Sequence, residues 1–126
     1  MSKEIISTPN APAAIGPYSQ AVKTGNMVFL SGQIPLLPET MEMIEGGISE
    51  QSQQVFKNLT AVAEAAGGSL NDAVKVNISL TDLGDFAAVN EVMASVFDEP
   101  YPARACVQVA ALPRGAMVEI EVILAL

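Results

Sequence analysis

The sequence predicts an α+β protein, a two-layer sandwich in which two helices cover one face of a mixed sheet. Two observations carry this prediction: two segments have apolar residues at helical spacing, and five others have the alternation or hairpin pattern of strands. Each helix has one apolar stripe, so both need a sheet to cover. The elements follow the order β-β-α-β-α-β-β, and no repeat or change in composition divides the chain, which predicts a single domain over residues 1–126.

Two strands are expected near the N-terminus. Residues 1–17 are expected to be irregular, because three prolines limit regular structure there: Pro9, Pro12 and Pro17. Residues 19–24 and 27–31 have strand patterns, and Gly25-Asn26 between them suits a two-residue hairpin loop. The Pro- and Gly-containing residues 33–47 predict a loop with room for a minor strand.

Two helices are expected in the middle of the chain. The first is expected to begin near Ser49, which can cap it, and to end at Gly67-Gly68. Its apolar stripe is Val55, Leu59, Val62 and Ala66. The second helix is expected to follow Asp82 as its cap and to break at residues 99–102. Its apolar stripe is Phe86, Val89, Met93 and Val96.

Three further strands complete the expected sheet. Residues 73–81 alternate, with Val74, Val76, Ile78 and Leu80 on one side. Residues 103–109 and 117–124 alternate in the same way. If these last two strands pair antiparallel, their apolar faces must coincide on the core side. Five other side chains would then share the face away from the helices: Arg104, Cys106, Gln108, Glu119 and Glu121.

Composition excludes several classes of function. The chain has no histidine, one cysteine and a formal net charge of −8. Without histidine, Ser-His-Asp and Cys-His catalysis and His-ligated metal sites are excluded. A lone cysteine forms no internal disulfide. The six cationic side chains are spread along the chain, so we expect neither nucleic acid nor an anionic membrane surface as a partner.

Hydropathy and charge content give two more expectations. No apolar stretch is long enough for a transmembrane helix, and the N-terminal residues lack the pattern of a signal peptide, so we expect a cytoplasmic protein. Only 16% of the residues are charged. This low charge content predicts that part of an apolar surface is buried in an oligomer.

Arg104 is the first candidate site residue, because the chain has only two arginines and this one lies in an otherwise apolar strand. It can form a structural ion pair with Glu119 or Glu121, or its guanidinium can bind a small carboxylate through two hydrogen bonds. In the second case a nearby glutamate would handle a proton or a water molecule. The periodicity does not choose between Glu119 and Glu121.

Two other residues are candidates for the same site. Cys106 is interpreted as a small buried hydrophobic side chain that shapes the site, since activation of its thiol would need Arg104 or a backbone dipole. Tyr18 follows Gly16-Pro17 in a loop and is either a packing aromatic or part of the site. The sequence contains no phosphate-binding glycine loop and no calcium loop, so no metal site is expected.

Several separated motifs resemble those of one known family. They are Ala-Pro-Ala-Ala-Ile-Gly-Pro-Tyr-Ser-Gln-Ala at 11–21, Ser-Gly-Gln-Ile-Pro at 31–35, Pro-Ala-Arg-Ala-Cys-Val at 102–107, Leu-Pro at 112–113 and Val-Glu-Ile-Glu-Val at 118–122. The motifs follow in the right order over nearly the full length. In them the chain resembles the Rid family (YjgF/TdcF-like), and within it the RidA group of 2-iminobutanoate/2-iminopropanoate deaminases.

The resemblance implies a fold, an assembly and an activity. The implied fold is chorismate-mutase-like, and the implied assembly is a homotrimer whose sheets form a central barrel, with sites between subunits. The implied reaction hydrolyses reactive 2-imino acids, such as 2-iminobutanoate and 2-iminopropanoate, to 2-oxo acids and ammonia. The implied ligand is a small 2-imino or 2-oxo carboxylate, and the resemblance implies no metal or organic cofactor.

The resemblance also implies roles for individual residues. Arg104 matches the arginine that binds the substrate carboxylate, and Glu119 matches the glutamate that positions or activates water. The positions that match the rest of the pocket lining are Tyr18, Ser31, Gly32 and Cys106. The chain departs from the common motif at Ala105, Gln108 and Ala111, where many members have serine, glutamate and arginine. These departures leave the preferred imine and the level of activity open.

Three other functions stay open on the sequence alone. The same cleft could sense a 2-oxo or 2-imino acid without catalysing its hydrolysis, as a regulatory protein would. A chaperone-like protein could use the apolar surface and would be indifferent to Arg104. A ribonuclease fits poorly with a net charge of −8.

Overall fold

The structure is a computed structural model and describes residues 2–126. In this range it contains two α-helices and six strands: β1 (Glu4–Ile6), β2 (Ala21–Thr24), β3 (Met27–Gln33), α1 (Ile48–Ala65), β4 (Ala73–Leu80), α2 (Phe86–Val96), β5 (Ala103–Gln108) and β6 (Val118–Ala125). Three short 3-10 helices lie at Leu70–Asp72, Leu83–Asp85 and Pro113–Gly115. β1 is an additional strand inside a segment that was expected to be irregular, and the elements after it follow the expected order.

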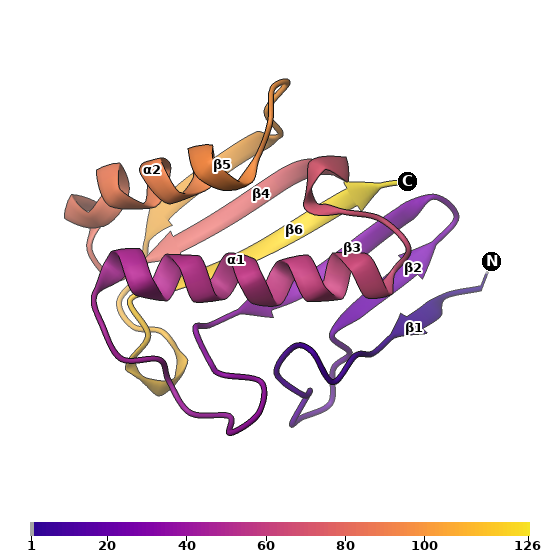
Figure 1. Cartoon of the computed structure of the whole chain (residues 1–126), viewed down its shortest axis with the longest axis horizontal. Coiled ribbons are helices and arrows are strands. Elements are labelled where there is room, and N and C mark those ends of the chain that lie inside the picture. Colours follow the sequence, from indigo (N-terminus) through magenta and orange to yellow (C-terminus); the bar gives the residue numbers. More distant parts are fainter. Residues whose placement is uncertain (1) are drawn as a thin grey trace.

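The strands form one mixed sheet in the order β1-β2-β3-β6-β4-β5. β4 and β5 are parallel, and the other neighbouring pairs are antiparallel. Both helices lie on one face of this sheet, α1 across its middle and α2 beside β4 and β5 (Figure 1). In the described part of the chain the opposite face carries no helix, so the expected two-layer α+β sandwich is confirmed.

The start of α1 differs from the expectation. Gly47, not Ser49, is the N-cap, because the side chain of Glu50 folds back and accepts a hydrogen bond from the Gly47 N–H at 2.8 Å. This contact uses a backbone donor that the helix leaves unpaired, and it places a negative charge at the positive end of the helix. The end of α1 is as expected: Gly67 has a φ of 92°, which glycine adopts readily.

The cap of the second helix also lies slightly upstream. The Asp82 carboxylate accepts a hydrogen bond from the Gly84 N–H at 2.8 Å and so caps the 3-10 turn Leu83–Asp85. This turn runs directly into α2, whose own N-cap is Asp85. Asp82 therefore begins the helical segment, as expected, but through a turn of 3-10 helix.

The hydrophobic core lies between the helices and the sheet. Its fully buried members include Val55, Leu59 and Val62 from α1, Val76, Ile78 and Leu80 from β4, and Val118, Ile120, Val122 and Leu124 from β6. Burial of each such side chain stabilises the fold by about 1.5–3 kcal/mol before entropy is counted. Val74 was expected in this set but is exposed, because a shift in the β4–β6 register between Ala73 and Lys75 turns it away.

The last two strands do not pair, which corrects the expected arrangement. β6 lies between β3 and β4, whereas β5 is an edge strand that pairs in parallel with β4. In this register Arg104 lies beside Val76, whose side chain is buried under the helices. Neighbouring residues in register point to the same face. Arg104, Cys106 and Gln108 therefore lie on the helix face of β5, and not on the open face with Glu119 and Glu121.

The open face of the sheet exposes several large apolar side chains. The main ones are Ile5 of β1 (54% exposed), Phe29 of β3 (46%) and Val107 of β5 (52%). They belong to strands distributed from one edge of the sheet to the other. A sheet face of this kind is typical of a surface that another protein chain covers.

Candidate functional site

A cleft of about 540 Å³ opens beside the C-terminal end of β3 and the first residues of β6, and we call it the Glu119 cleft. Its lining residues include Ala13, Ile15, Tyr18, Ser31, Gly32, Met41, Arg114, Glu119 and Glu121. These come from the loop before β2, from β3, from the following loop and from β6. The structure therefore brings together four of the expected site residues: Tyr18, Ser31, Gly32 and Glu119.

Glu119 packs directly against Gly32. β3 has an irregularity between Leu30 and Gln33, after which Gln33 pairs with Ile120. This irregularity places Gly32 next to the Glu119 side chain: a Cβ on Gly32 would lie 3.0 Å from the Glu119 Cδ. Only glycine leaves room for the carboxylate in this position without movement of the glutamate.

The two glutamates of β6 differ in their surroundings. Glu121 is exposed, and its Oε1 accepts a hydrogen bond from the Asn77 Nδ2 at 3.1 Å. Glu119 is half-buried, and this burial, with a smaller contribution from the charge of Glu121, raises the pKa of the Glu119 carboxyl above its usual value. A carboxyl with a raised pKa is a stronger base once ionised, which suits proton transfer. The environment therefore favours Glu119 where periodicity could not choose.

Tyr18 and Ser31 form another wall of the Glu119 cleft. The Tyr18 N–H donates to the Gly16 carbonyl at 2.8 Å, and the Tyr18 ring packs over Gly16, where an added Cβ would be 3.6 Å from the ring. The Ser31 Oγ donates to the Ser19 carbonyl at 2.5 Å. Because its proton is used in this bond, the Ser31 hydroxyl presents lone pairs to the cleft and can accept a hydrogen bond from a ligand.

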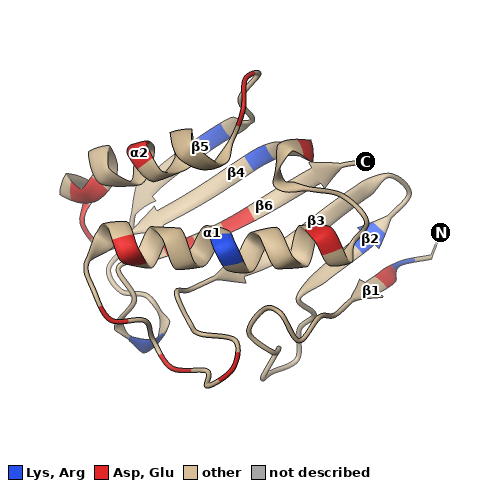
Figure 2. Ribbon diagram, in the orientation of Figure 1, with Lys and Arg blue, Asp and Glu red and all other residues tan. Residues whose placement is uncertain are grey.

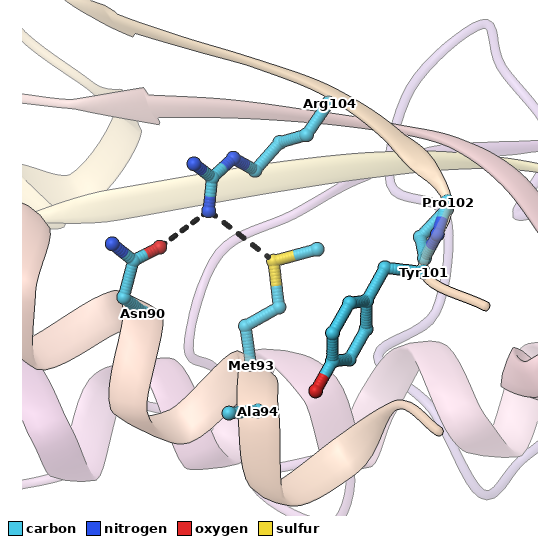
Figure 3. Close-up of a pocket in the computed structure, with 6 residues that line it drawn as sticks. All are labelled: Asn90, Met93, Ala94, Tyr101, Pro102 and Arg104. Atoms are coloured by element: carbon cyan, nitrogen blue, oxygen red, sulfur yellow. Dashed lines mark hydrogen bonds between the residues drawn. The ribbon is translucent and has the colours of Figure 1, made fainter. Parts of the chain in front are cut away.

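Arg104 lies in a different hollow, on the helix side of β5. This hollow, of about 410 Å³, is lined by Asn90, Met93, Ala94, Tyr101, Pro102 and Arg104, and we call it the Arg104 hollow (Figure 3). The Arg104 Nη1 donates to the Asn90 Oδ1 and lies 3.9 Å from the Met93 Sδ. Its Cζ lies 4.9 Å from the centre of the Phe86 ring, which is within the range of a cation–π contact. Three residues of α2 thus hold an otherwise exposed guanidinium.

Cys106 follows Arg104 by two residues on the same face of β5. It lines a shallow depression with Leu83, Phe86 and Arg104, and it packs against the core. Burial raises the pKa of the Cys106 thiol, and the charge of Arg104 opposes this only in part. The thiol is therefore protonated at neutral pH and is a poor nucleophile, in keeping with a role in shaping the site.

The expected site residues thus fall into two groups in one chain. Arg104 and Glu119 lie on opposite faces of the sheet, separated by β4. An ion pair between Arg104 and either glutamate of β6, which the sequence left open, is therefore excluded within one chain. The sequence assigned Phe86 and Met93 to the apolar stripe of α2 and did not place them, or Asn90, beside Arg104. The one available signal was Asn90, a polar residue among the apolar positions of its helix.

Residues 2–126 contain no group of three or more acidic or cysteine side chains placed to hold a metal ion. The basic residues are distributed over several elements, among acidic residues (Figure 2). Within residues 2–126 no helix has the length and apolar character needed to cross a membrane.

The chain is similar to known proteins over nearly its whole length. The profile of the family described as Endoribonuclease L-PSP matches residues 8–126. A protein of Dermatophagoides farinae named 2-iminobutanoate/2-iminopropanoate deaminase is 55% identical, with 94% of this chain and 93% of that protein covered. The crystal structure of RidA from an Antarctic Psychrobacter bacterium has a TM-score of 0.95 and 62% identity, with 98% and 99% of the two chains covered.

A third relative is known with a bound small molecule. The crystal structure of Escherichia coli TdcF with bound serine has a TM-score of 0.93 and 47% identity, and 98% of each chain is covered. Full-length matches at this identity show common ancestry as well as a common fold. The chain therefore belongs to the Endoribonuclease L-PSP family, which is the Rid (YjgF) family that its motifs resemble.

Proposed function

We propose that this protein is a cytoplasmic enamine/imine deaminase that hydrolyses 2-iminobutanoate, 2-iminopropanoate and similar 2-imino acids to 2-oxo acids and ammonia. The observation that carries the proposal is the half-buried carboxyl of Glu119, with its raised pKa, in a cleft beside Tyr18, Ser31 and Gly32. Relatives that are about half identical over the full length carry the name of this activity.

We further propose that the complete site forms between subunits of a homotrimer. Arg104 and Glu119 are on opposite faces of one sheet, so one chain cannot place both on a small substrate. The exposed apolar side chains of the open face, such as Phe29 and Val107, support burial of that face against other subunits. In this arrangement the Arg104 hollow of one subunit faces the Glu119 cleft of its neighbour.

The proposed mechanism needs a carboxylate clamp, a base and water. Arg104 binds the substrate carboxylate through two hydrogen bonds and holds the imine carbon near a bound water. Glu119 takes a proton from this water as its oxygen bonds to the imine carbon. Glu119 returns this proton to the nitrogen, which has taken the electron pair of the C=N π bond, and a carbinolamine forms. Glu119 then moves the proton of the new hydroxyl to the amino group. The C–N bond breaks with its electron pair on nitrogen, so ammonia leaves and the hydroxyl oxygen becomes the carbonyl oxygen of the 2-oxo acid. The imine is already electrophilic, so positioning of the substrate and the water supplies most of the rate acceleration.

A competition assay tests the proposal. An amino-acid oxidase or a dehydratase generates the imine in the assay, and semicarbazide traps whatever imine remains. The protein should lower the trapped yield, and Arg104→Ala should abolish this effect while the variant stays folded with the parental oligomeric mass. An Arg104→Ala variant with full activity would refute the assignment of Arg104.

A sensor is the second candidate, because the TdcF crystal structure holds bound serine, a small molecule that carries a carboxylate. Saturable binding of 2-oxobutanoate with no effect on the trapped yield would favour the sensor. The endoribonuclease activity in the family's description is not supported here, since a net charge of −8 opposes binding of RNA phosphates. A chaperone-like role would be indifferent to Arg104→Ala.

A further inference from the structure

The loop between β1 and β2, residues 7–20, forms one wall of the Glu119 cleft. It begins and ends at the same place, because Ile6 at the end of β1 pairs with Ala21 at the start of β2. The loop contributes Ala13, Ile15 and Tyr18 to the cleft. A second hollow, of about 460 Å³, lies against the same loop and also contacts Ala13 and Tyr18. Residues 13–18 of this wall are therefore exposed, whereas Ala11 earlier in the loop is buried in the hydrophobic core.

The backbone of the loop forms few hydrogen bonds within itself. Its three prolines have no N–H group, so they cannot donate backbone hydrogen bonds. Nevertheless the carbonyls of Thr8, Ala11 and Pro12 point inward to one place, and unpaired carbonyls there would be costly. They need a donor from outside the loop's own backbone.

Gln20 supplies that donor. Its side chain is 4% exposed, and its Nε2 lies 2.8 Å from the Pro12 carbonyl, 3.1 Å from the Thr8 carbonyl and 3.3 Å from the Ala11 carbonyl. The two amide protons of Gln20 are therefore shared among three carbonyl acceptors. The Gln20 Oε1 accepts from the Thr8 N–H at 2.7 Å, so the side chain pairs with Thr8 as a neighbouring strand would.

The backbone around Gln20 connects this clamp to the cleft residue Ser31. The Gln20 carbonyl accepts from the Ser31 N–H at 3.0 Å, and the neighbouring Ser19 carbonyl accepts from the Ser31 Oγ at 2.5 Å. Tyr18 is two residues before Gln20. One buried amide therefore links the loop that carries Tyr18 to the strand that carries Ser31.

We propose that Gln20 is a positioning residue, which fixes Tyr18 and the Ser31 hydroxyl in the Glu119 cleft without touching the substrate. This inference rests on the proposed function for its kinetic consequence, but the position of the loop can be tested without catalysis. Displacement of a binding group by about 1 Å can cost up to ~100-fold in rate. Since Tyr18 and Ser31 contact the substrate in the proposed site, loss of the clamp should raise KM more than it lowers kcat.

Two variants of Gln20 remove the donor in different ways. Gln20→Met keeps the length of the side chain but no hydrogen-bonding amide. Gln20→Glu, tested at pH 8, keeps the acceptor for the Thr8 N–H and loses both donors. The matched control is Gln54→Met, which removes another buried amide (6% exposed). Its side chain donates a hydrogen bond to Asn58 on the same helix and lies outside the loop.

The first readout is kinetic. We expect both Gln20 variants to raise KM by about tenfold with a smaller change in kcat, whereas Gln54→Met lowers thermal stability and leaves KM unchanged. Parental KM in either folded Gln20 variant would refute the proposal. So would an equal rise of KM in Gln54→Met, since the effect would then be general destabilisation.

The second readout does not depend on the reaction. The chain has two tyrosines and no tryptophan, so a Tyr101→Phe background leaves Tyr18 as the only fluorescent tyrosine. In this background both Gln20 variants should increase quenching of Tyr18 by acrylamide, and Gln54→Met should not. Unchanged quenching would refute the clamp. Increased quenching in a protein that hydrolyses no imine would support the clamp and refute only the proposed function.

Discussion

The Glu119 cleft and the Arg104 hollow hold their charged groups in different ways. Glu119 is on β6, a strand paired on both sides, and it is half-buried against Gly32. Arg104 is on the edge strand β5, is exposed, and depends on side-chain contacts with α2. A base needs surroundings that tune its pKa, whereas a carboxylate clamp needs an open approach. The difference is the one expected if each chain supplies two complementary halves of the proposed site.

The most decisive test mixes two inactive variants. Arg104→Ala and Glu119→Gln should each have very little activity alone, because each removes one half of every site. In randomly mixed trimers about a quarter of the sites would combine an intact Arg104 with an intact Glu119 from the neighbouring subunit. We therefore expect activity to reappear, which the semicarbazide assay measures after co-expression.

The same experiment can contradict the arrangement. If both groups belonged to a site within one chain, every site of a mixed trimer would keep one defect. No recovery at any ratio of the two variants, with mixed trimers confirmed by mass, would therefore exclude a shared site. In a control, the wild-type protein is mixed with each variant separately. This measures how much activity falls when wild-type subunits share trimers with a defective variant.

The next largest effect should come from Glu119→Gln by itself. Loss of a positioned general base lowers kcat by about 10²–10⁴-fold, with KM little changed because Arg104 still binds the carboxylate. In the parent, kcat/KM should fall on the acid side at a pH above the ordinary glutamate pKa, since the folded pKa is raised. This acid limb should be absent from the residual activity of the variant.

Stability gives an independent check on the same carboxyl. A raised folded pKa means that the folded state binds the proton more tightly than the unfolded chain does. The parent should therefore lose stability as the pH rises from the unfolded value, about 4.3, to the folded one, and stay constant above it. Glu119→Gln lacks this loss. Across this pH window, thermal melts should show the melting temperature of Glu119→Gln rising relative to that of the parent. The opposite trend would contradict the raised pKa of Glu119.

The sequence predicted the two layers of this fold better than it predicted which strands pair with each other. The two helices and the hairpin at Gly25-Asn26 follow from local periodicity and turn chemistry. β1 has three residues, too few to show a period. Alternation also placed Arg104 and Glu119 correctly within their own strands, but the partner of β5 is set by contacts distant in sequence. Because β5 pairs with β4 and not with β6, the polar face of β5 lies toward the helices.

The candidate site shows the same limit. The motifs identified Tyr18, Ser31, Gly32 and Glu119, which the fold gathers in one cleft. Periodicity alone did not distinguish Glu119 from Glu121, because residues two apart on a strand share a face. Their difference arises from the irregularity in β3 that places Gly32 against one of them, and from the Asn77 side chain beside the other.

A smaller effect is expected from Gly32→Ala. The new Cβ would lie 3.0 Å from the Glu119 Cδ, so the carboxylate must shift by a few tenths of an ångström. We expect kcat/KM to fall by about tenfold. Gly32 has no positive φ, so thermal stability should change little. Steady-state kinetics and thermal melts measure the two effects.

Gly25→Ala is the matched control for that substitution. Gly25 has a φ of 58°, and no other side chain or strand lies within 4 Å of its added Cβ. Alanine should therefore cost about 1–2 kcal/mol of stability and leave kcat/KM unchanged, because the hairpin is outside the cleft. If Gly32→Ala loses stability as Gly25→Ala does and keeps its activity, close contact with Glu119 is not required.

The smallest effect is expected from Phe86→Leu, on the Arg104 side of the comparison. Leucine keeps an apolar side chain beside Arg104 but removes the ring whose centre lies 4.9 Å from the Cζ. An exposed cation–π contact contributes about 0.5–1 kcal/mol, which corresponds to a two- to fivefold rise in KM. Because Glu119 is untouched, kcat and its acid limb should be preserved. Phe86→Tyr keeps the ring and should raise KM less than Phe86→Leu does, and equal effects of the two would show that Asn90 and Met93 alone orient the guanidinium.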